Sequence, residues 1–188
     1  MAEVVNSSFS EAKPTIVVIG YGNPQRGDDA IGQTVISRLK TLKIPAVEAF
    51  LVTQLTPELA DKLTAADFAI FVDACKLKDV GAVKIKSLDA CGSETAGSAV
   101  PAFGHSCDPC SLLALAASAY GHCPKAWWVE VPASDFTAGQ PLSGLAERGV
   151  EQALDAIVEL IDSVAQTVPN GYSPTGETRR HSVNSPHQ

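Results

Sequence analysis

Residues 16–32 read IVVIGYGNPQRGDDAIG and join a buried strand, a glycine turn and two adjacent acids within one short segment. The β-branched run at 16–19 is closed by a glycine, which is typical of a strand that is buried on both faces of a parallel sheet. Gly20 and Gly22 then turn the chain, and Asp28 and Asp29 follow where a helix is expected to begin. The segment therefore predicts a strand, a turn and a helix, with negative charge at the turn.

The two glycines resemble a dinucleotide-binding loop, but the pattern is incomplete. In that loop a third glycine, here at position 25, lets the helix pack beneath a pyrophosphate, and this chain has Gln25 instead. The acidic pair would also repel a phosphate at the start of the helix, where it favours a cation or a proton. A nucleotide-binding α/β protein that uses Gly20 and Gly22 remains a rival interpretation.

Composition limits the compartment and the partners. The chain has 188 residues, 45% of them hydrophobic, which suits one domain with a full core. A net charge of −7 without a dense basic patch argues against nucleic acid as a partner. There is no basic leader with an apolar core, and no apolar run approaches the ~20 residues of a membrane helix. The cysteine count is odd, which favours reduced thiols. We expect a cytoplasmic protein with no nucleic-acid or membrane partner.

Strand-like and helix-like segments alternate along the chain. This order predicts an α/β three-layer sandwich with a mostly parallel central sheet of about five strands, flanked by helices on both faces. The expected strands are residues 16–20, 46–52, 67–73, 81–88 and 126–131. The expected helices are residues 29–42, 57–63, 109–120 and 143–166. Valine and isoleucine alternate with lysine in 81–88, which indicates a half-solvated strand near a sheet edge.

Several residues are expected to end or begin these elements. Asp108 is a candidate N-cap for the helix at 109–120, with proline at its first position and Gly121 after its last. Thr56 is a candidate N-cap for the helix at 57–63.

The expected domain lies between polar tails. Residues 1–13 and 169–188 are predicted to be disordered, because they hold little apolar surface to bury, and residues 14–168 form the single globular domain. Residues 89–104 are rich in Gly, Ser, Ala and Thr and lack periodicity, so we expect a long loop there. This loop leads to His105.

Asp29, Asp73 and His105 are expected at one edge of the sheet. Ligands of open α/β sheets bind beyond the carboxyl ends of the strands, and Asp73 ends the apolar run 68–72. Each residue also has a structural interpretation, as a cap or turn former for the acids and as a hydrogen-bonded core residue for the histidine. Together they make an O/O/N ligand set for a divalent cation with coordination positions left open.

Three segments resemble the hydrogenase maturation endopeptidases in order and spacing. They are GYGNPQRGDDAIG at 20–32, FVDACK at 71–76 and GHSCDPCSLLALAASAYG at 104–121. The resemblance implies that 14–168 is a protease domain that removes a C-terminal extension from the large-subunit precursor of a nickel-iron hydrogenase after nickel insertion. The HSCDPC context resembles the branch that serves bidirectional hydrogenases.

The resemblance also implies the site. Asp29, Asp73 and His105 are the implied metal ligands and catalytic residues, with nickel supplied by the substrate and no tightly held catalytic metal. The bound cation would polarise the scissile carbonyl and activate water while Asp29 or Asp73 accepts the proton. In the best-known members the first ligand is usually Glu, so the reach of Asp29 differs. We expect a monomer. The alternative is a nickel-binding accessory protein with the same site and no hydrolysis.

Four residues near these motifs have other interpretations. Cys107 and Cys110 form a CxxC, which is either a zinc or redox site or two small residues at a helix start; structural zinc needs four ligands, and no second CxxC exists. The helix dipole is expected to lower the thiol pKa of Cys110. Asp28 is interpreted as a capping or supporting acid. Arg26 either anchors the substrate or pairs with Asp28, and an ion pair is the commoner arrangement at an exposed turn.

Overall fold

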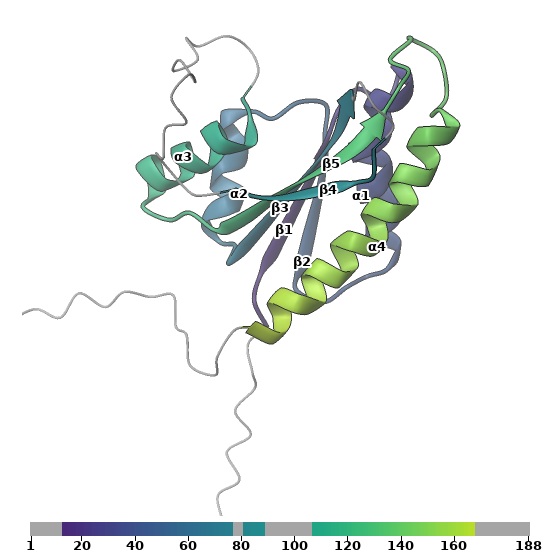
Figure 1. Cartoon of the computed structure of the whole chain (residues 1–188). Helices are drawn as coiled ribbons and strands as arrows, with labels where there is room; N and C mark the ends of the chain where they lie inside the picture. Colours follow the sequence, from purple (N-terminus) through teal and green to yellow (C-terminus); the bar gives the residue numbers. More distant parts are fainter. Residues whose placement is uncertain (1–12, 77–80, 89–106, 168–188) are drawn as a thin grey trace, which may run out of the picture.

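The computed structural model describes residues 13–76, 81–88 and 107–167 (Figure 1). Within these ranges five strands form one sheet in the order β2-β1-β3-β5-β4. Their bounds are β1 Ile16–Tyr21, β2 Val47–Val52, β3 Phe68–Lys76, β4 Lys84–Leu88 and β5 Lys125–Ala133. Strands β1, β2, β3 and β5 are parallel, whereas β4 runs antiparallel to β5 at the sheet edge. The predicted edge position of this strand is therefore confirmed, but the strand is more solvated than predicted, because residues 84–87 are all exposed and Ile85 is 41% exposed.

Helices cover both faces of this sheet, as Figure 1 shows. The helical segments are η1 Gly27–Ala30, α1 Ile31–Thr41, η2 Pro57–Leu59, α2 Ala60–Thr64, α3 Pro109–Tyr120 and α4 Gly144–Thr167. Helices α1 and α4 pack on one face, and α2 and α3 pack on the other. The predicted three-layer α/β sandwich is confirmed.

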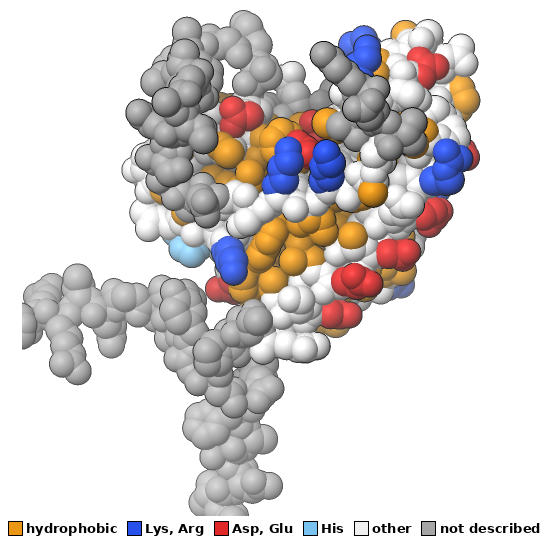
Figure 2. All heavy atoms as spheres, in the orientation of Figure 1, with side chains coloured by type: hydrophobic (Ala, Val, Ile, Leu, Met, Phe, Trp, Pro, Cys, Tyr) orange, Lys and Arg blue, Asp and Glu red, His pale blue; other side chains and the backbone are white. Residues whose placement is uncertain are grey.

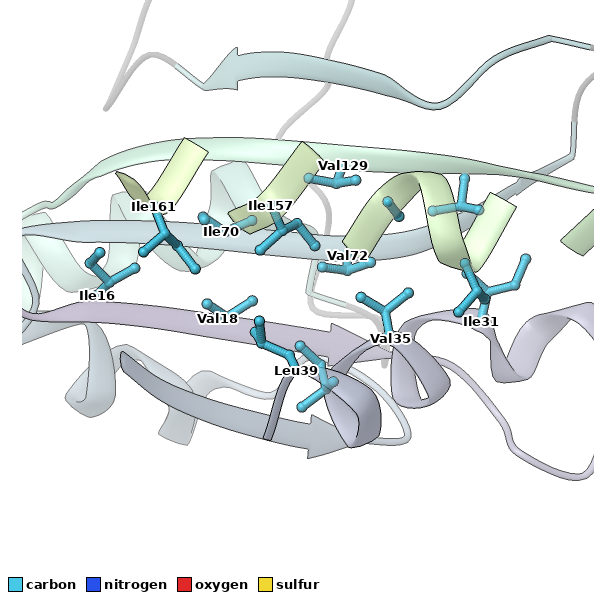
Figure 3. Close-up of a cluster of buried hydrophobic side chains, with 14 of the residues drawn as sticks. Ile16, Val18, Ile31, Val35, Leu39, Ile70, Val72, Val129, Ile157 and Ile161 are labelled. Atoms are coloured by element: carbon cyan, nitrogen blue, oxygen red, sulfur yellow. The ribbon is translucent and has the colours of Figure 1, made fainter. Parts of the chain in front are cut away.

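The core explains why the central strands are apolar at every position. Successive side chains of a strand point to opposite faces, so a strand that is covered on both sides buries all of them. Val17 and Ile19 of β1 pack under α2 and α3. On the other face, strand residues pack against α1 and α4 (Figure 3). The strands contribute Ile16, Val18, Ile70, Val72 and Val129, and the helices contribute Val35, Leu39, Ile157 and Ile161.

Helix α4 has one apolar and one acidic face. Val150, Ile157 and Ile161 are buried against the sheet. Acidic side chains line its outer surface in Figure 2; they are Glu151, Asp155, Glu159 and Asp162. In the described ranges no helix is both long enough and apolar enough to cross a membrane.

The ends of α3 follow the predicted capping pattern. The Asp108 carboxylate accepts a hydrogen bond from the Ser111 backbone N–H at 2.8 Å, and Pro109 is the first helical residue. Gly121 ends the helix in the left-handed region with φ of +72°. Thr56 is the N-cap residue of η2, as predicted, although its side chain makes no capping hydrogen bond there.

Strand β3 is longer than predicted. Its pairing with β1 ends at Gly20 and Val72, but its pairing with β5 continues to Lys76. Asp73 therefore lies inside β3, at the first position beyond the β1 ladder, and does not end the strand. The tails predicted at 1–13 and 169–188 and the loop predicted at 89–104 fall outside the described residues, apart from Lys13.

Candidate functional site

The candidate site lies where the chain changes direction along the sheet. From β1 the chain passes through α1 to β2 on one side, and from β2 through α2 to β3 on the other side. Helix α1, which follows β1, and helix α2, which precedes β3, thus lie on opposite faces, and open α/β sheets bind ligands in the crevice between two such strands. Asp29 follows β1 and Asp73 lies on β3. The two carboxylates are close enough for the charge of Asp29 to raise the pKa of Asp73.

Glycines bring Asp29 to this position. Gly32 lets the first turn of α1 pack directly against the sheet. A Cβ at this position would lie 2.7 Å from the carbonyl oxygen of Val72. Gly22 has φ of +133°, and its Cα faces the backbone carbonyl of Asp29. The N–H of Asn23 donates to Oδ2 of Asp29 at 3.2 Å. The glycines of the motif therefore serve close packing of a helix on strand ends.

Asp73 has an environment that shifts its protonation toward neutral pH. Its side chain is half-buried, and burial is the main cause that raises its pKa to about 6. The backbone N–H of Ala74, at 2.7 Å, and the hydroxyl of Tyr21 lower the pKa, whereas the charges of Asp29 and Glu130 raise it. A carboxyl group with this pKa both holds and releases a proton near neutral pH, as general acid–base catalysis requires.

Tyr21 and Glu130 belong to the same crevice, and sequence reasoning missed both. Burial and the charge of Asp73 raise the pKa of Tyr21. Glu130 is in register with Asp73 on the neighbouring strand, is only 8% exposed and accepts a hydrogen bond from Nζ of Lys86 at 2.8 Å. The sequence contains a feature that could have indicated each residue. Tyr21 follows Ile19 by two positions on the same face, and Glu130 interrupts an apolar run.

Trp128 also faces this crevice. It packs with Tyr21 against the α2 and α3 side of the sheet. Its indole Nε1 is buried, and its interaction with the Tyr21 hydroxyl lowers the pKa of Tyr21. Nζ of Lys86 lies 5.8 Å from the centre of its ring.

Asp28 is a buried supporting acid that binds the connection from β5 to α4. It is fully buried, and its carboxylate accepts backbone N–H groups of Ser134 and Ser143, each at 2.7 Å, and of Asp135 at 3.0 Å. Burial by itself raises the pKa, but the hydrogen bonds from Ser134, Ser143 and Asp135 outweigh it and hold the pKa below its usual value. No ion pair joins Asp28 to Arg26 in the described part of the chain, so that prediction is wrong.

The start of α3 reaches the same crevice. Cys107 packs against the cluster that contains Tyr21, and the charge of Asp108 raises the pKa of Tyr21. His105 itself lies outside the described residues. Within the described ranges, no three His, Cys, Asp or Glu side chains form a group that could hold a metal ion. The structure thus brings Asp29 and Asp73 together and leaves the third predicted ligand untested.

Solved structures share this fold. The [NiFe] hydrogenase maturation protease HycI from Thermococcus kodakarensis KOD1 aligns with a TM-score of 0.61 and 26% identity, over 82% of this chain and 96% of that chain. The chain has the fold of the hydrogenase maturation proteases. The maturating endopeptidase HybD from E. coli aligns with a TM-score of 0.62 and 22% identity, over 80% of this chain and 93% of that chain. The hydrogenase 2 maturation peptidase from Thaumarchaeota archaeon SCGC_AB-539-E09 aligns with a TM-score of 0.58 and 23% identity, over 78% of this chain and 97% of that chain.

These similarities confirm the resemblance to the maturation proteases and the predicted enzyme class, a hydrolase acting on peptide bonds. No protein-family model matches the sequence, and no curated protein matches it.

The thiols at the start of α3 are less reactive in this protease fold than predicted. Cys107 and Cys110 are not disulfide-bonded. Desolvation and the charge of Asp108 raise the pKa of Cys110, so the prediction of a lowered pKa is wrong. The N-cap carboxylate places negative charge at the helix end that would otherwise favour a thiolate.

Proposed function

We propose that this protein is an endopeptidase that removes a C-terminal extension from the large-subunit precursor of a nickel-iron hydrogenase after nickel insertion. The fold supports the class, since HycI of T. kodakarensis is named a [NiFe] hydrogenase maturation protease. The observation that carries the proposal is the coupling of the Asp29 and Asp73 carboxylates at the crevice between β1 and β3. Two neighbouring acids there, one of which has its pKa raised by the charge of the other, suit proton transfer and cation recognition.

Nickel recognition is part of the proposal. Asp29 and Asp73 supply carboxylate oxygens, and His105 supplies an imidazole nitrogen, a donor set that accepts a divalent first-row metal. The nickel is carried by the precursor, so it is substrate and no resident cofactor of this chain. A protease that needs the metal of its substrate stays inactive toward other cytoplasmic proteins.

The proposed hydrolysis uses water as the nucleophile. The cation supplies Lewis-acid polarisation of the scissile carbonyl. Asp73 is the acid whose pKa of about 6 suits acceptance of a proton from water near neutral pH. The Tyr21 hydroxyl interacts with this carboxylate and orients it. Asp29 is the second carboxylate of the site, held by the N–H of Asn23.

A processing assay tests this function. The purified protein is incubated with nickel-loaded large-subunit precursor, and loss of the C-terminal tail is followed by mass spectrometry. We expect cleavage of the loaded precursor and no cleavage of the metal-free precursor. Asp29→Asn, Asp73→Asn and His105→Ala are each expected to abolish cleavage. The matched control is Asp61→Asn, because Asp61 is exposed on α2 and pairs with its neighbour Lys62 at 3.6 Å.

The same assay distinguishes the peptidase from the alternative, a nickel-binding accessory protein without hydrolytic activity. An intact tail after incubation with the nickel-loaded precursor, while the precursor is still cut by a control maturation protease, contradicts hydrolysis. Retention of nickel by the protein in that experiment favours the accessory function. Full activity in one of the three site variants removes that residue from the site.

A further inference from the structure

A cavity of about 730 Å³ lies beside the candidate site, between residues 23–26 and 138–141. The first loop follows β1, and the second belongs to the connection from β5 to α4. In Figure 1 this green connection lies next to the purple turn that precedes α1. Neither the proposed hydrolysis nor nickel recognition uses this cavity.

Hydrogen bonds hold the two loops together. The N–H of Gly139 donates to the carbonyl of Gln25 at 2.8 Å, and the N–H of Asp28 donates to the carbonyl of Asp135 at 2.7 Å. The buried Asp28 carboxylate also binds the N–H groups of Ser134 and Asp135. The walls of the cavity are therefore set by the fold before any ligand arrives.

Arg26 is the one charged residue among those that line the cavity. It is exposed, and no ion pair joins it to an acid within the described ranges. Two acids in these loops make other interactions than an ion pair with Arg26. Asp28 is fully buried, and Oδ1 of Asp135 accepts the N–H of Thr137 at 2.8 Å. A guanidinium without a carboxylate partner, in a preformed cavity, favours an anionic ligand.

The cavity borders the site through Asn23. Asn23 lines the cavity, and its N–H donates to Oδ2 of Asp29 at 3.2 Å. A peptide whose scissile bond lies near Asp29 therefore places a neighbouring residue beside Arg26. Pro24 and Pro141 form an apolar wall of the cavity, against which the aliphatic part of that residue packs.

We propose that this cavity binds a carboxylate of the peptide substrate, with Arg26 as the specificity-determining residue. The carboxylate belongs either to an acidic side chain next to the scissile bond or to the C-terminus of the extension. The planar guanidinium forms two parallel hydrogen bonds to a carboxylate, which lysine does not reproduce. This inference rests on the proposed peptidase function.

A binding experiment tests the cavity without cleavage. The ¹⁵N-labelled full chain is titrated with three peptides: acetyl-Ala-Ala-Glu-Ala-Ala-amide, the same peptide with Gln for Glu, and acetyl-Ala-Ala-Gln-Ala-Ala with a free C-terminus. We expect shifts of the Gln25 and Gly139 amide signals with a carboxylate peptide and none with the Gln amide. Response to the Glu amide alone identifies a side chain as the ligand, and response to the free acid alone identifies the C-terminus.

Variants separate charge from geometry. Arg26→Gln is expected to weaken binding of the carboxylate peptide about tenfold, as loss of a bidentate charged pair does, and Arg26→Lys to weaken it less. Arg148→Gln is the control, since Arg148 is an exposed arginine of α4. Equal binding of all three peptides, the absence of a response to both carboxylate peptides, or full binding of the carboxylate peptide by Arg26→Gln overturns the proposal.

Processing kinetics then distinguish this inference from the proposed function. In the precursor assay, Arg26→Gln is expected to raise KM about tenfold with a smaller change in kcat, because Arg26 contacts a part of the substrate away from the scissile bond. An unchanged KM overturns the role of Arg26 while the peptidase function stands. Failure of the wild type to cut the precursor contradicts the peptidase function, and the peptide titration still decides the carboxylate site.

Discussion

Asp73 of β3 lies in register with Glu130 of β5, so two carboxylates stand side by side on neighbouring parallel strands. Such strands are only about 4.8 Å apart. Glu130 is held by Nζ of Lys86, 2.7 Å from Oε2, whereas Asp73 accepts hydrogen bonds from the Ala74 N–H and the Tyr21 hydroxyl and has no cationic partner in the described part of the chain. The pair therefore separates into a carboxylate with a cationic partner and a carboxyl that titrates near neutral pH.

The first prediction concerns this titration in the metal-free protein. The pKa of Asp73 is raised to about 6, so the folded state binds its proton more tightly than the unfolded state does. Stability from this group is present at acidic pH and is lost as pH rises through about 6. Asp73→Asn removes that loss, so the stability of the variant relative to the wild type is expected to increase from about pH 4 to about pH 7. This range spans the ordinary pKa of an aspartate and the raised pKa of Asp73. Urea denaturation across this range measures the difference.

Two comparisons make this prediction specific. Asp61→Asn is expected to follow the wild type at every pH, since Asp61 is exposed. Glu130→Gln is expected to lower the pKa of Asp73 slightly, because it removes one charge and leaves burial in place. A pKa of Asp73 at its ordinary value, measured by carboxyl ¹³C NMR, contradicts the pH dependence expected for Asp73→Asn and the shift expected for Glu130→Gln.

The second prediction concerns the buried carboxylate of Asp28. Asp28→Asn places an amide among backbone N–H donors and leaves buried groups without acceptors, so a loss of about 2–3 kcal/mol in unfolding free energy is expected. The native pKa of Asp28 is held low, so this contribution is present above its ordinary pKa and is lost as pH falls through the folded pKa. The gap between variant and wild type should narrow in acid. A loss no larger than that of the exposed Asp162→Asn would falsify this role.

The third prediction concerns the contact between α1 and the sheet. In Gly32→Ala the added Cβ would lie 2.7 Å from both the Tyr21 nitrogen and the Val72 oxygen, so the helix must move off the strand ends. We expect at least about 2 kcal/mol of destabilisation and reduced processing, because Asp29 moves with the helix. Gly144→Ala is the matched control, since the nearest atom there is an Arg148 nitrogen at 3.6 Å. Equal stability of the two variants contradicts the packing argument.

The fourth prediction concerns the length of the first acid. Asp29→Glu keeps the carboxylate and adds one methylene, so measurable processing of nickel-loaded precursor is expected, whereas Asp29→Asn should have none. The ratio of kcat/KM between Asp29→Glu and the wild type measures how well the site accommodates the longer acid. Thr34 lies on the next turn of the helix and bonds the carbonyl of Ala30 at 2.9 Å, so Thr34→Ser is a conservative control. Equal processing by Asp29→Glu and Asp29→Asn means that the negative charge is not required.

Local signals in the sequence predicted the elements well. The bounds 109–120 of α3 follow from the Asp108 cap, the proline and the left-handed Gly121, all of which act within a few residues. The apolar runs that became β1 and the first half of β3 are typical of strands covered on both faces, and the alternating lysines of β4 indicated the sheet edge. The family resemblance and the peptide-hydrolase class also came from motifs alone.

Long-range pairing decided what the motifs could not. Strand β3 continues past Asp73 because β5 pairs with it to Ala133, and no local pattern encodes that register. The burial of Asp28 depends on N–H groups more than a hundred residues away in the chain, such as that of Ser143. The Asp73 pKa depends on Glu130 and Tyr21, which meet it only in the folded sheet.

The sequence by itself determined a strand, a glycine turn and an acidic helix start, together with the class of fold that these build. The tertiary structure alone decided the roles of the two adjacent acids. Asp28 became the buried acceptor that fastens two loops, and Asp29 became the neighbour of Asp73 at the crevice. The physical reason is that hydrogen bonding and charge coupling depend on distances between elements, which a local pattern of residue types does not contain.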